Sequence, residues 1–599
     1  MLKDCMEIFN EKLQETKKRF GDEERLILDE YIPAEGDYLI VKRNGEIQHC
    51  SIVKNKQQYE WNTGNEDLKE AIQFYDYHSR LVSSNKPLDL KKIILSNNYF
   101  SFWVKWESLS NGKLNPNAID RYFDVLKDPK KKYKKVQDRK LYNCIAEQVG
   151  DINEGVLESN RKWIHEHIFD LDAMHISFSR KLYLKIFFEA DKEQYINEEK
   201  RYLMVNIFNS NDYNLEIDGR ILGVPTENLG LNAKKPFLET KTRKSFAPHL
   251  ITLEEAIKRR MFFDYLMNKA QRNESDVFFE NNEYETKIVA LKKGKMPGDD
   301  FSGYYLRINK GIELEILHQD TIVDYKLLLD RPFNYQNVLD CNDDGKDDSY
   351  QVYKNRQSVQ DIINTVLFNK YLVGNYFTEV DKLPKIDAIL KHNLIWSRGA
   401  IFEWLYNGRK DSMPQIFHKL CMNMMKYSIS NGYMLKAKKQ FNLMNSFDEY
   451  FGGKDMSSKY NEIREKLKEK INQPINSEPA AIDTDEEYFY AVGQAVNYLI
   501  YLSKSKNKAH SLANPFFNAT NDDVIKSRLR QLFVKYDYAL RYNGYRFNQL
   551  YALIADYEVN GKVSQEDIIA GYISRNIIFE SNKQDENNSN GNETSTIEN

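Results

Sequence analysis

Two groups of residues in this sequence have the types and spacing that could hold a catalytic metal ion. Asp299 and Asp300 are adjacent carboxylates of the kind that bind Mg²⁺ in polymerase-like enzymes. Such a pair needs a third carboxylate and a strand-turn-strand frame. Pro297 and Gly303 flank the pair, so we favour a polar loop that enters a strand.

The second group is His165, His167 and His175, with acidic residues between them. Neutral imidazoles and carboxylates suit Zn²⁺ or Mn²⁺. The segment reads H-E-H-I-F rather than H-E-x-x-H, and the spacing places the three histidines on no shared face. We therefore favour ordinary surface histidines.

An acidic run at 340–345 matches the first half of an EF-hand Ca²⁺ loop. The twelfth position of such a loop should be a bidentate Glu, and here it is Gln351. The cage is therefore incomplete, and we expect an acidic loop between domains.

Sequence signatures of several enzyme classes are absent. The chain has no G-x-x-x-x-G-K-[ST] phosphate loop, no G-x-S-x-G nucleophile elbow and no C-x-x-C pair among its five Cys. We therefore expect no catalytic residue, no cofactor and no bound metal. The alternative is a metal-dependent nuclease or polymerase-like enzyme that uses Asp299 and Asp300, or His165, His167 and His175.

The segment 127–140 has chemistry suited to nucleic acid. It holds eight basic and two acidic residues in the order K-D-P-K-K-K-Y-K-K-V-Q-D-R-K. A flexible run of lysines neutralises phosphates without choosing among bases; the alternative is a solvated, charged connector. The residues expected to contact phosphate are Lys130, Lys131, Lys132, Lys134 and Lys135.

A second basic segment, 232–244, interleaves basic residues with Asn, Thr and Phe, and Pro236 and Pro248 favour a constrained loop. Such a mixture offers phosphate donors together with groups that reach base edges or stack on bases; the alternative is a structural loop. We select Asn232 for reading a base edge. The expected contacts are Asn232, Lys234, Lys235, Lys241, Arg243 and Lys244.

The aromatic stretch 99–103 alternates large apolar residues, which favours a buried strand or helix. Asn97 and Asn98 directly precede it. We expect these two polar residues at the surface, where they could contact nucleic acid.

The elements that must position these residues change type along the chain. Apolar residues at helical spacing predict helices over 1–30, 65–80 and 117–126. Asn44-Gly45 predicts a two-residue type I′ hairpin between strands. Further strand-like runs lie at 202–208, 213–221, 285–291 and 304–324.

From about residue 358 the pattern becomes helical, with helices expected at 359–377, 383–406, 415–429, 457–471, 486–504, 519–542 and 546–557. We predict an α+β N-terminal domain over 1–345, followed by a mostly α-helical C-terminal bundle over 358–580. A linker is expected near 472–485, where Pro474 and Pro479 lie. The polar residues 581–599 are predicted to be disordered.

Composition limits the class of protein. The formal net charge of −3 excludes a uniformly basic surface, so nucleic-acid contact would have to come from local patches. The opening residues lack a signal-peptide pattern, and no apolar run approaches the roughly 18 residues that span a bilayer. We expect a cytoplasmic protein with no membrane contact.

Several longer motifs occur in order from residue 1 to about 580. The N-terminal ones are M-L-K-D-C-M-E-I-F at 1–9, L-I-L-D-E-Y-I-P-A-E-G-D-Y-L-I-V at 26–41, F-Y-D-Y-H-S at 74–79 and I-L-S-N-N-Y-F-S-F at 94–102. The most specific is L-N-A-K-K-P-F-L-E-T-K-T-R-K at 231–244, followed by L-I-T-L-E-E-A at 250–256. N-P-F-F-N-A at 514–519 and I-I-A-G-Y-I at 568–573 complete the series. Together they resemble the large subunits of type I-B CRISPR complexes, the Csh-type or Cas-eight-b family.

The resemblance implies a non-catalytic large subunit of a Cascade effector complex in antiviral defence. Such a subunit binds guide CRISPR RNA and target double-stranded DNA, and its N-terminal domain reads the short flanking motif, the PAM. Its helical bundle borders the displaced strand and helps recruit the Cas-three helicase-nuclease, while other Cascade subunits are its partners. Some members carry Cys pairs in the central region; residues 204–230 here have none, so we expect no structural zinc.

Overall fold

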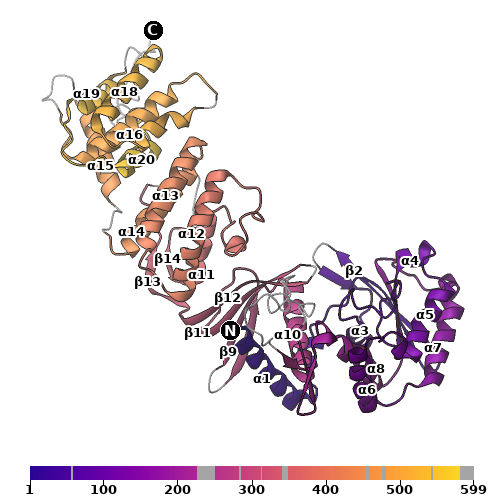
Figure 1. The fold of residues 1–599 in the computed structure, drawn as a ribbon. Helices are drawn as coiled ribbons and strands as arrows, with labels where there is room; N and C mark the ends of the chain where they lie inside the picture. The colour runs from indigo at the N-terminus through magenta and orange to yellow at the C-terminus, as the bar shows by residue number, and fades with distance from the viewer. Residues whose placement is uncertain are drawn as a thin grey trace, which may run out of the picture. The chain divides into compact units, whose positions relative to one another are not determined.

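The computed structural model describes residues 1–55, 58–225, 250–281, 285–311, 313–339, 349–453, 458–474, 480–506, 508–540 and 544–580. Sheets and helices mix in the N-terminal region, and helices dominate the C-terminal region (Figure 1). The predicted fold class, α+β followed by a helical bundle, is confirmed. The predicted tail, the run 340–345 and residues 475–479 of the expected linker lie outside the described residues.

The chain forms two compact units. Unit 1 comprises Met1–Lys293 and Gly303–Thr321, and unit 2 comprises Gly294–Ser302 and Ile322–Asn599. The boundary between the two units lies earlier in the chain than residue 358, where the sequence pattern becomes helical. The reason is that β13 (Leu328–Asn334) pairs with β14 (Val352–Asn355) and packs on helices of unit 2.

A five-stranded sheet is the centre of unit 1. Its order is β3 (Gln58–Trp61), β2 (Ile47–Asn55), β1 (Gly36–Val41), β5 (Tyr183–Phe188) and β4 (Ser101–Lys105). Only the β1–β5 pair is parallel. Successive side chains of a strand point to opposite faces, so each strand contributes side chains to a hydrophobic core on either face of the sheet.

Helices cover both faces of this sheet. Tyr38 and Phe187 lie on the face covered by α3 (Glu66–Ser79). Leu39 and Ile186 lie on the other face, which packs against three helices. These are α5 (Pro116–Lys127), α7 (Glu154–His167) and α8 (Lys192–Asn206).

A buried charge lies in the α3 side of the sheet. The ammonium group of Lys185 in β5 forms an ion pair with Asp76 of α3, and both side chains are almost fully buried. The ammonium also lies 3.6 Å from the centroid of the Trp103 ring. Asp76 accepts a second hydrogen bond, of 2.6 Å, from the Tyr31 hydroxyl. The buried ammonium and the buried carboxylate therefore both have partners, as the cost of burying a charge requires.

The hairpin between β1 and β2 exists, but its predicted turn type is wrong. The Lys42 amide donates to the Glu46 carbonyl over 2.8 Å, which leaves a three-residue loop. Gly45 has a φ of 85°, whereas Asn44 is outside the positive-φ region that a type I′ turn requires at both positions. The Asn44 side chain instead accepts from the Glu46 amide over 2.9 Å, which stabilises the longer loop.

Unit 1 also contains α1 (Leu2–Phe20), α2 (Arg25–Leu28), α4 (Trp106–Ser110), α6 (Val136–Val149) and α10 (Leu253–Gln271). A second core joins Phe9, Phe262, Val277 and Leu306. A small sheet has the order β6 (Leu215–Ile217), β7 (Arg220–Gly223), β8 (Ile251–Thr252). A further sheet has the order β10 (Thr286–Leu291), β9 (Asp276–Asn281), β11 (Phe301–Lys310), β12 (Leu314–Tyr325).

Two N-terminal predictions need correction. The helix expected over 1–30 ends at Phe20, because Gly21 adopts a left-handed φ of 77° and its amide caps the Lys17 carbonyl. The strand expected at 202–208 lies mostly in helix α8, which a capping box of Asp191 and Gln194 starts. The run 285–291 contains one strand, and the runs 213–221 and 304–324 each contain all or part of two.

Unit 2 contains every C-terminal helix expected from periodicity, with shifted ends. These are α11 (Arg356–Val366), α12 (Ala388–Asn407), α13 (Met413–Ser430), α15 (Lys459–Ile471), α16 (Asp485–Tyr501), α18 (Asp522–Tyr536) and α19 (Tyr545–Asp556). Helices α14 (Met434–Tyr450), α17 (Asn514–Phe517) and α20 (Gln565–Ile573) were not expected. Short 3₁₀ turns complete both units: η1 (Pro129–Lys131), η2 (Leu171–Met174), η3 (Asn211–Tyr213), η5 (Val373–Asn375), η6 (His510–Ala513), η7 (Asp537–Ala539) and η8 (Ile577–Phe579).

Helix α16 is the central helix of the C-terminal group in Figure 1 and contacts α15, α18, α19 and α20. Its Gly493 faces Gly571 of α20, so the two backbones approach closely. Across the described ranges, no helix combines the length and apolarity needed to cross a membrane.

Candidate nucleic-acid interface

The basic segment 127–140 is an anchored turn between α5 and α6 rather than the flexible run expected. Pro129 opens the 3₁₀ turn η1 and is buried. Tyr133 is also buried, its ring lies 5.6 Å from that of Tyr142, and its hydroxyl accepts a hydrogen bond from the Asn206 side chain. The tyrosine therefore fixes the backbone of the turn.

Three lysines of this turn remain available to a ligand. Lys130, Lys131 and Lys134 are exposed, and within the part of the chain that the structure describes none has an ion pair or a side-chain hydrogen bond. Exposed ammonium groups of this kind suit sequence-independent contact with phosphates.

Other lysines of the segment are already paired with acids at the surface. Lys135 lies 2.5 Å from Asp212, and this hydrogen bond raises the pKa of Lys135. Lys140 lies 2.6 Å from Glu216. Ion pairs between exposed side chains are weak because water screens them, so a phosphate could compete for either ammonium.

Lys132, also selected from the sequence as a phosphate contact, is oriented differently from the exposed lysines. Its ammonium group points inward and donates to the Pro87 carbonyl. Burial lowers the pKa of Lys132 to about 8. The same ammonium lies 5.6 Å from the centroid of the Tyr202 ring of α8.

Asn97 and Asn98 are also buried, so their expected surface position is wrong. The Asn97 side chain donates to the Arg80 carbonyl over 3.0 Å. The Asn98 side chain donates to Asn97 over 2.9 Å and accepts from the Phe100 amide over 3.0 Å. Both residues hold the chain that leads into β4 and cannot reach a ligand from there.

The second basic segment falls outside the described residues, with Asn232, Lys234, Lys235, Lys241, Arg243 and Lys244. The described residues on either side of it are nevertheless informative. Leu222 and Gly223 of β7 pair with Thr252 and Ile251 of β8. The chain therefore leaves and returns on adjacent strands of the small sheet.

That small sheet adjoins the lysine turn. Asp212 in η3 and Glu216 in β6 are the partners of Lys135 and Lys140, and β6 pairs directly with β7. The three exposed lysines thus lie in the same region of unit 1 as the two strands that precede and follow the second basic segment in the sequence.

The histidines of the alternative metal site do not act together. His165 lies 2.9 Å from Asp120, which also binds Arg161. His167 binds the Trp163 carbonyl and stacks on the Trp163 ring, and His175 is exposed in the turn after η2.

The carboxylate pair lies in a loop before β11. Asp300 accepts from the Leu327 amide over 3.0 Å and lies 3.4 Å from the Lys326 ammonium. This matches the favoured interpretation of a polar loop that enters a strand. Among the described residues, no three His, Cys, Asp or Glu side chains gather as a metal site would require.

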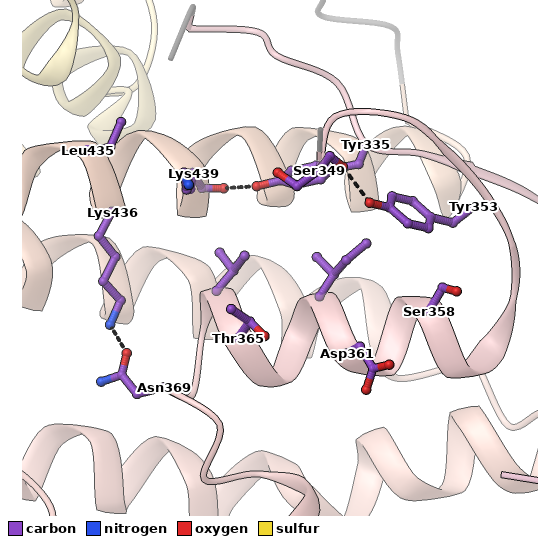
Figure 2. A pocket seen from close by; sticks show the side chains of 12 residues that line it. Tyr335, Ser349, Tyr353, Ser358, Asp361, Thr365, Asn369, Leu435, Lys436 and Lys439 are labelled. Atoms are coloured by element: carbon purple, nitrogen blue, oxygen red, sulfur yellow. Dashed lines mark hydrogen bonds between the residues drawn. The ribbon is translucent and has the colours of Figure 1, made fainter. Parts of the chain in front are cut away.

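Unit 2 contains a cavity of about 710 Å³ between α11 and α14 (Figure 2). Its tyrosine hydroxyls bond the protein: Tyr335 donates to the Lys439 carbonyl and Tyr353 to the Ser349 carbonyl. The Lys436 ammonium, which Figure 2 shows at the other end, donates to the Asn369 side chain. These groups stabilise the walls and form no nucleophile–base pair.

A surface that sequence reasoning missed lies at the end of α16. Tyr501, Tyr538 and Phe579 are each more than half exposed. The Tyr501 and Phe579 rings are 4.8 Å apart, and the ammonium groups of Lys508 and Lys504 lie over Tyr501 and Tyr538. Lysines at alternate positions after Tyr501 were the available signal. Exposed rings beside lysines suit stacked bases of a single strand.

No family model, curated protein or solved structure matches this chain.

Proposed function

We propose that this chain is the large subunit of a type I-B Cascade complex. In this role it binds guide CRISPR RNA and target double-stranded DNA, reads the PAM, contacts other Cascade subunits and helps recruit the Cas-three helicase-nuclease. The ordered motifs between residue 1 and about 580 suggest the family. The chemistry of unit 1 supports nucleic-acid binding without catalysis.

One observation carries the proposal. Lys130, Lys131 and Lys134 extend from an anchored turn, next to the small sheet whose strands β7 and β8 precede and follow the second basic segment in the sequence. The three lysines concentrate positive charge on a protein whose net charge is −3. A local concentration of positive charge is the footprint expected of a nucleic-acid contact.

The two basic segments would have different roles in binding nucleic acid. The three lysines present charges on an ordered backbone but no groups that distinguish bases, so they would hold phosphates. Asn232, within the second segment, has the amide chemistry that pairs with a base edge. We assign it the reading of the PAM.

The metal-dependent alternative has less support. Asp300 is engaged by Leu327 and Lys326, and His165 by Asp120. A nuclease or polymerase-like site would need further ligands around these residues, and the described residues supply none.

The test replaces Lys130, Lys131 and Lys134 with Gln and measures duplex binding over a range of salt concentrations. Each lost phosphate contact lowers the salt slope by about 0.7–0.9, so we expect the slope to fall by about 2–3 and affinity to fall alike for all sequences. Lys3, Lys162 and Lys181 are also exposed on unit 1, and their triple Gln variant is the control of equal charge. Equal losses in both triple variants would refute the assigned surface.

A further inference from the structure

A cavity of about 540 Å³ lies in unit 1, where the parallel strands β1 and β5 end. Val41 and Phe188 are the last residues of these strands, they are partners in the strand register, and both line the cavity. Ligands commonly bind at the carboxyl ends of parallel strands. The volume lies within the roughly 300–1,000 Å³ of pockets that hold small organic molecules.

Helix α7 turns one face toward this cavity. Asn153 at its N-cap, and then Val156, Asn160 and Trp163, all line the wall. Their spacing of three, four and three residues places them on one side of a helix. Asn160 therefore lies in the middle of the face that a ligand would contact.

Aromatic rings reach the cavity from three parts of the chain. Trp163 lies on α7, Phe188 ends β5, and Tyr99 and Phe100 directly precede β4. The Trp163 ring is 5.5 Å from that of Phe188, and the Tyr99 ring is 4.5 Å from that of Phe100. Aromatic side chains of this kind hold planar rings, such as a base that has left its stack.

The Asn160 side chain is the polar group that points to a particular ligand. It is only 8% exposed, and its Nδ2 donates to the Tyr99 carbonyl over 3.0 Å. That bond identifies which end of the amide is the nitrogen. Among the residues that the structure describes, none donates a hydrogen bond to Oδ1 of Asn160. A buried polar atom without a partner is rare, so Oδ1 is matched to something that enters the cavity.

The amide of Asn160 selects among planar ligands. An amide nitrogen carries two hydrogens, so Nδ2 keeps a second donor beside the free Oδ1. Adenine matches this pair, because its N6 amino group donates and its N7 accepts, whereas guanine presents acceptors at both O6 and N7. A single water occupies about 30 Å³, so it would satisfy Oδ1 and leave most of the cavity unfilled.

Polar side chains at the rim suit a sugar. The exposed Glu189 carboxylate accepts from the Arg43 amide over 3.0 Å, and the Arg43 guanidinium pairs with Asp191 over 3.0 Å. A carboxylate beside a base site commonly accepts from a ribose hydroxyl. Glu189 therefore has the chemistry to orient a nucleoside at the entrance.

We propose that this cavity binds an adenine base. The N6 amino group donates to Oδ1 of Asn160, N7 accepts from Nδ2, and the ring lies against the aromatic wall. The base comes either from a free adenine nucleotide or from an unstacked residue of a bound strand, and only the second source rests on the proposed function. The lysine-turn triple variant leaves every cavity residue intact, so a failure of its duplex test would leave adenosine binding unchanged.

Calorimetric titration of the wild-type full-length protein with adenosine and with inosine is the first experiment. Inosine has a carbonyl in place of the N6 amino group and keeps N7 and the ribose. We expect a saturable heat with adenosine and about ten- to a hundredfold weaker binding of inosine, as is usual for a bidentate amide contact. No saturable heat with adenosine, or equal affinity for the two nucleosides, would overturn the proposal.

Asn160→Ala locates the site. We expect this variant to bind adenosine as weakly as inosine, because the group that distinguishes them is gone. Asn268→Ala is the matched control: Asn268 is also a buried asparagine on a helix of unit 1, and its Nδ2 donates to the Ile27 carbonyl over 2.9 Å, but it does not line the cavity. Both variants should lower Tm, and Asn268→Ala should keep the preference for adenosine. An unchanged preference in Asn160→Ala would refute the assignment.

A second arm identifies the source of the base. Adenosine monophosphate is compared with a single-stranded trinucleotide that has adenine between two uracils, in wild type and in Asn160→Ala. Tighter binding of the trinucleotide that is lost in Asn160→Ala identifies a bound strand. Tighter binding of the monophosphate, or a trinucleotide advantage that survives in Asn160→Ala, identifies a free nucleotide as the occupant. Binding of neither ligand would overturn the proposal.

Discussion

His78 lies between two carboxylates in the interior of unit 1. Its Nδ1 is 2.6 Å from Glu199 and its Nε2 is 3.1 Å from Glu24. Burial disfavours the charged imidazole, but Glu199 and Glu24 outweigh it and raise the pKa of His78 to about 9. Burial also opposes ionisation of Glu199, yet Arg260 and His78 lower its pKa to about 2. His78, Glu199 and Arg260 are therefore ionised at neutral pH, and their ion pairs join α3, α8 and α10.

This arrangement predicts a loss of stability at alkaline pH. Because the folded pKa of His78 lies above the unfolded value of about 6.5, its contribution is complete below about pH 6.5 and is lost as pH rises through about 9. The shift corresponds to about 3 kcal/mol of unfolding free energy. We expect the difference between wild type and His78→Gln, measured by denaturant unfolding, to shrink by that amount across this window.

The control for this measurement is His392→Gln, which changes an exposed histidine of α12. The pH dependence of its difference from wild type is compared with that of His78→Gln. A difference between wild type and His78→Gln that does not change with pH would show that His78 is not held as the charged form.

The lysines of the segment 127–140 show what local sequence can and cannot predict about the position of a side chain. Residues 127–140 are recognised as basic from composition alone, and the structure places Lys130, Lys131 and Lys134 at the surface. Lys132 differs because its ammonium group bonds the Pro87 carbonyl and lies 5.6 Å from the centroid of the Tyr202 ring. Both partners are far from Lys132 in the sequence, so local sequence could not identify which lysine turns inward.

Helices α16 and α20 approach closely because each carries a glycine at their contact. A Cβ on Gly493 would overlap the Ile568 carbonyl and lie 2.6 Å from the Tyr572 amide nitrogen. A Cβ on Gly571 would lie 2.8 Å from the Tyr490 carbonyl carbon. Glycine disfavours a helix by about 1 kcal/mol relative to Ala. The close approach of α16 and α20 explains why both positions are nevertheless glycine.

We therefore expect Gly493→Ala to destabilise the protein by about 1–3 kcal/mol, as overpacking usually does, despite the better helix propensity of Ala. Gly399→Ala is the matched change on α12, where a Cβ would meet nothing within 4 Å. That variant should be stabilised by up to about 1 kcal/mol. Denaturant unfolding would compare the two, and equal effects would contradict the close crossing.

Secondary structure was predictable where one pattern dominated a whole element. The C-terminal helices α12, α13, α15 and α16 follow apolar periodicity and were expected close to their observed positions. The stretch 202–208 failed because it is apolar and aromatic over a short length, which does not distinguish a strand from a buried helix. The capping residues that decide for a helix, Asp191 and Gln194, lie ten or so residues earlier.

The whole chain consists of two compact units, and β11 and β12 belong partly to each. Units with separate cores commonly unfold as separate cooperative transitions. The His78 network belongs to unit 1 and the α16–α20 crossing to unit 2.

We expect calorimetry of the full-length protein to show two transitions. Gly493→Ala should lower the Tm of one transition, and His78→Gln at neutral pH should lower the Tm of the other. If both variants shift a single common transition, the two units unfold together as one cooperative unit.

The two basic segments, the change from mixed to helical structure and the missing catalytic motifs could all be read along the chain, because each depends on residue types within a short window. Their consequences for a ligand depended on residues far apart in the sequence. The positions of the Lys132, Asn97 and Asn98 side chains depend on contacts with Pro87, with Tyr202 of α8 and with the end of α3. Burial is a property of the packed chain, and for that reason only the tertiary structure separated the exposed lysines of the basic segment from the lysine that bonds within the protein.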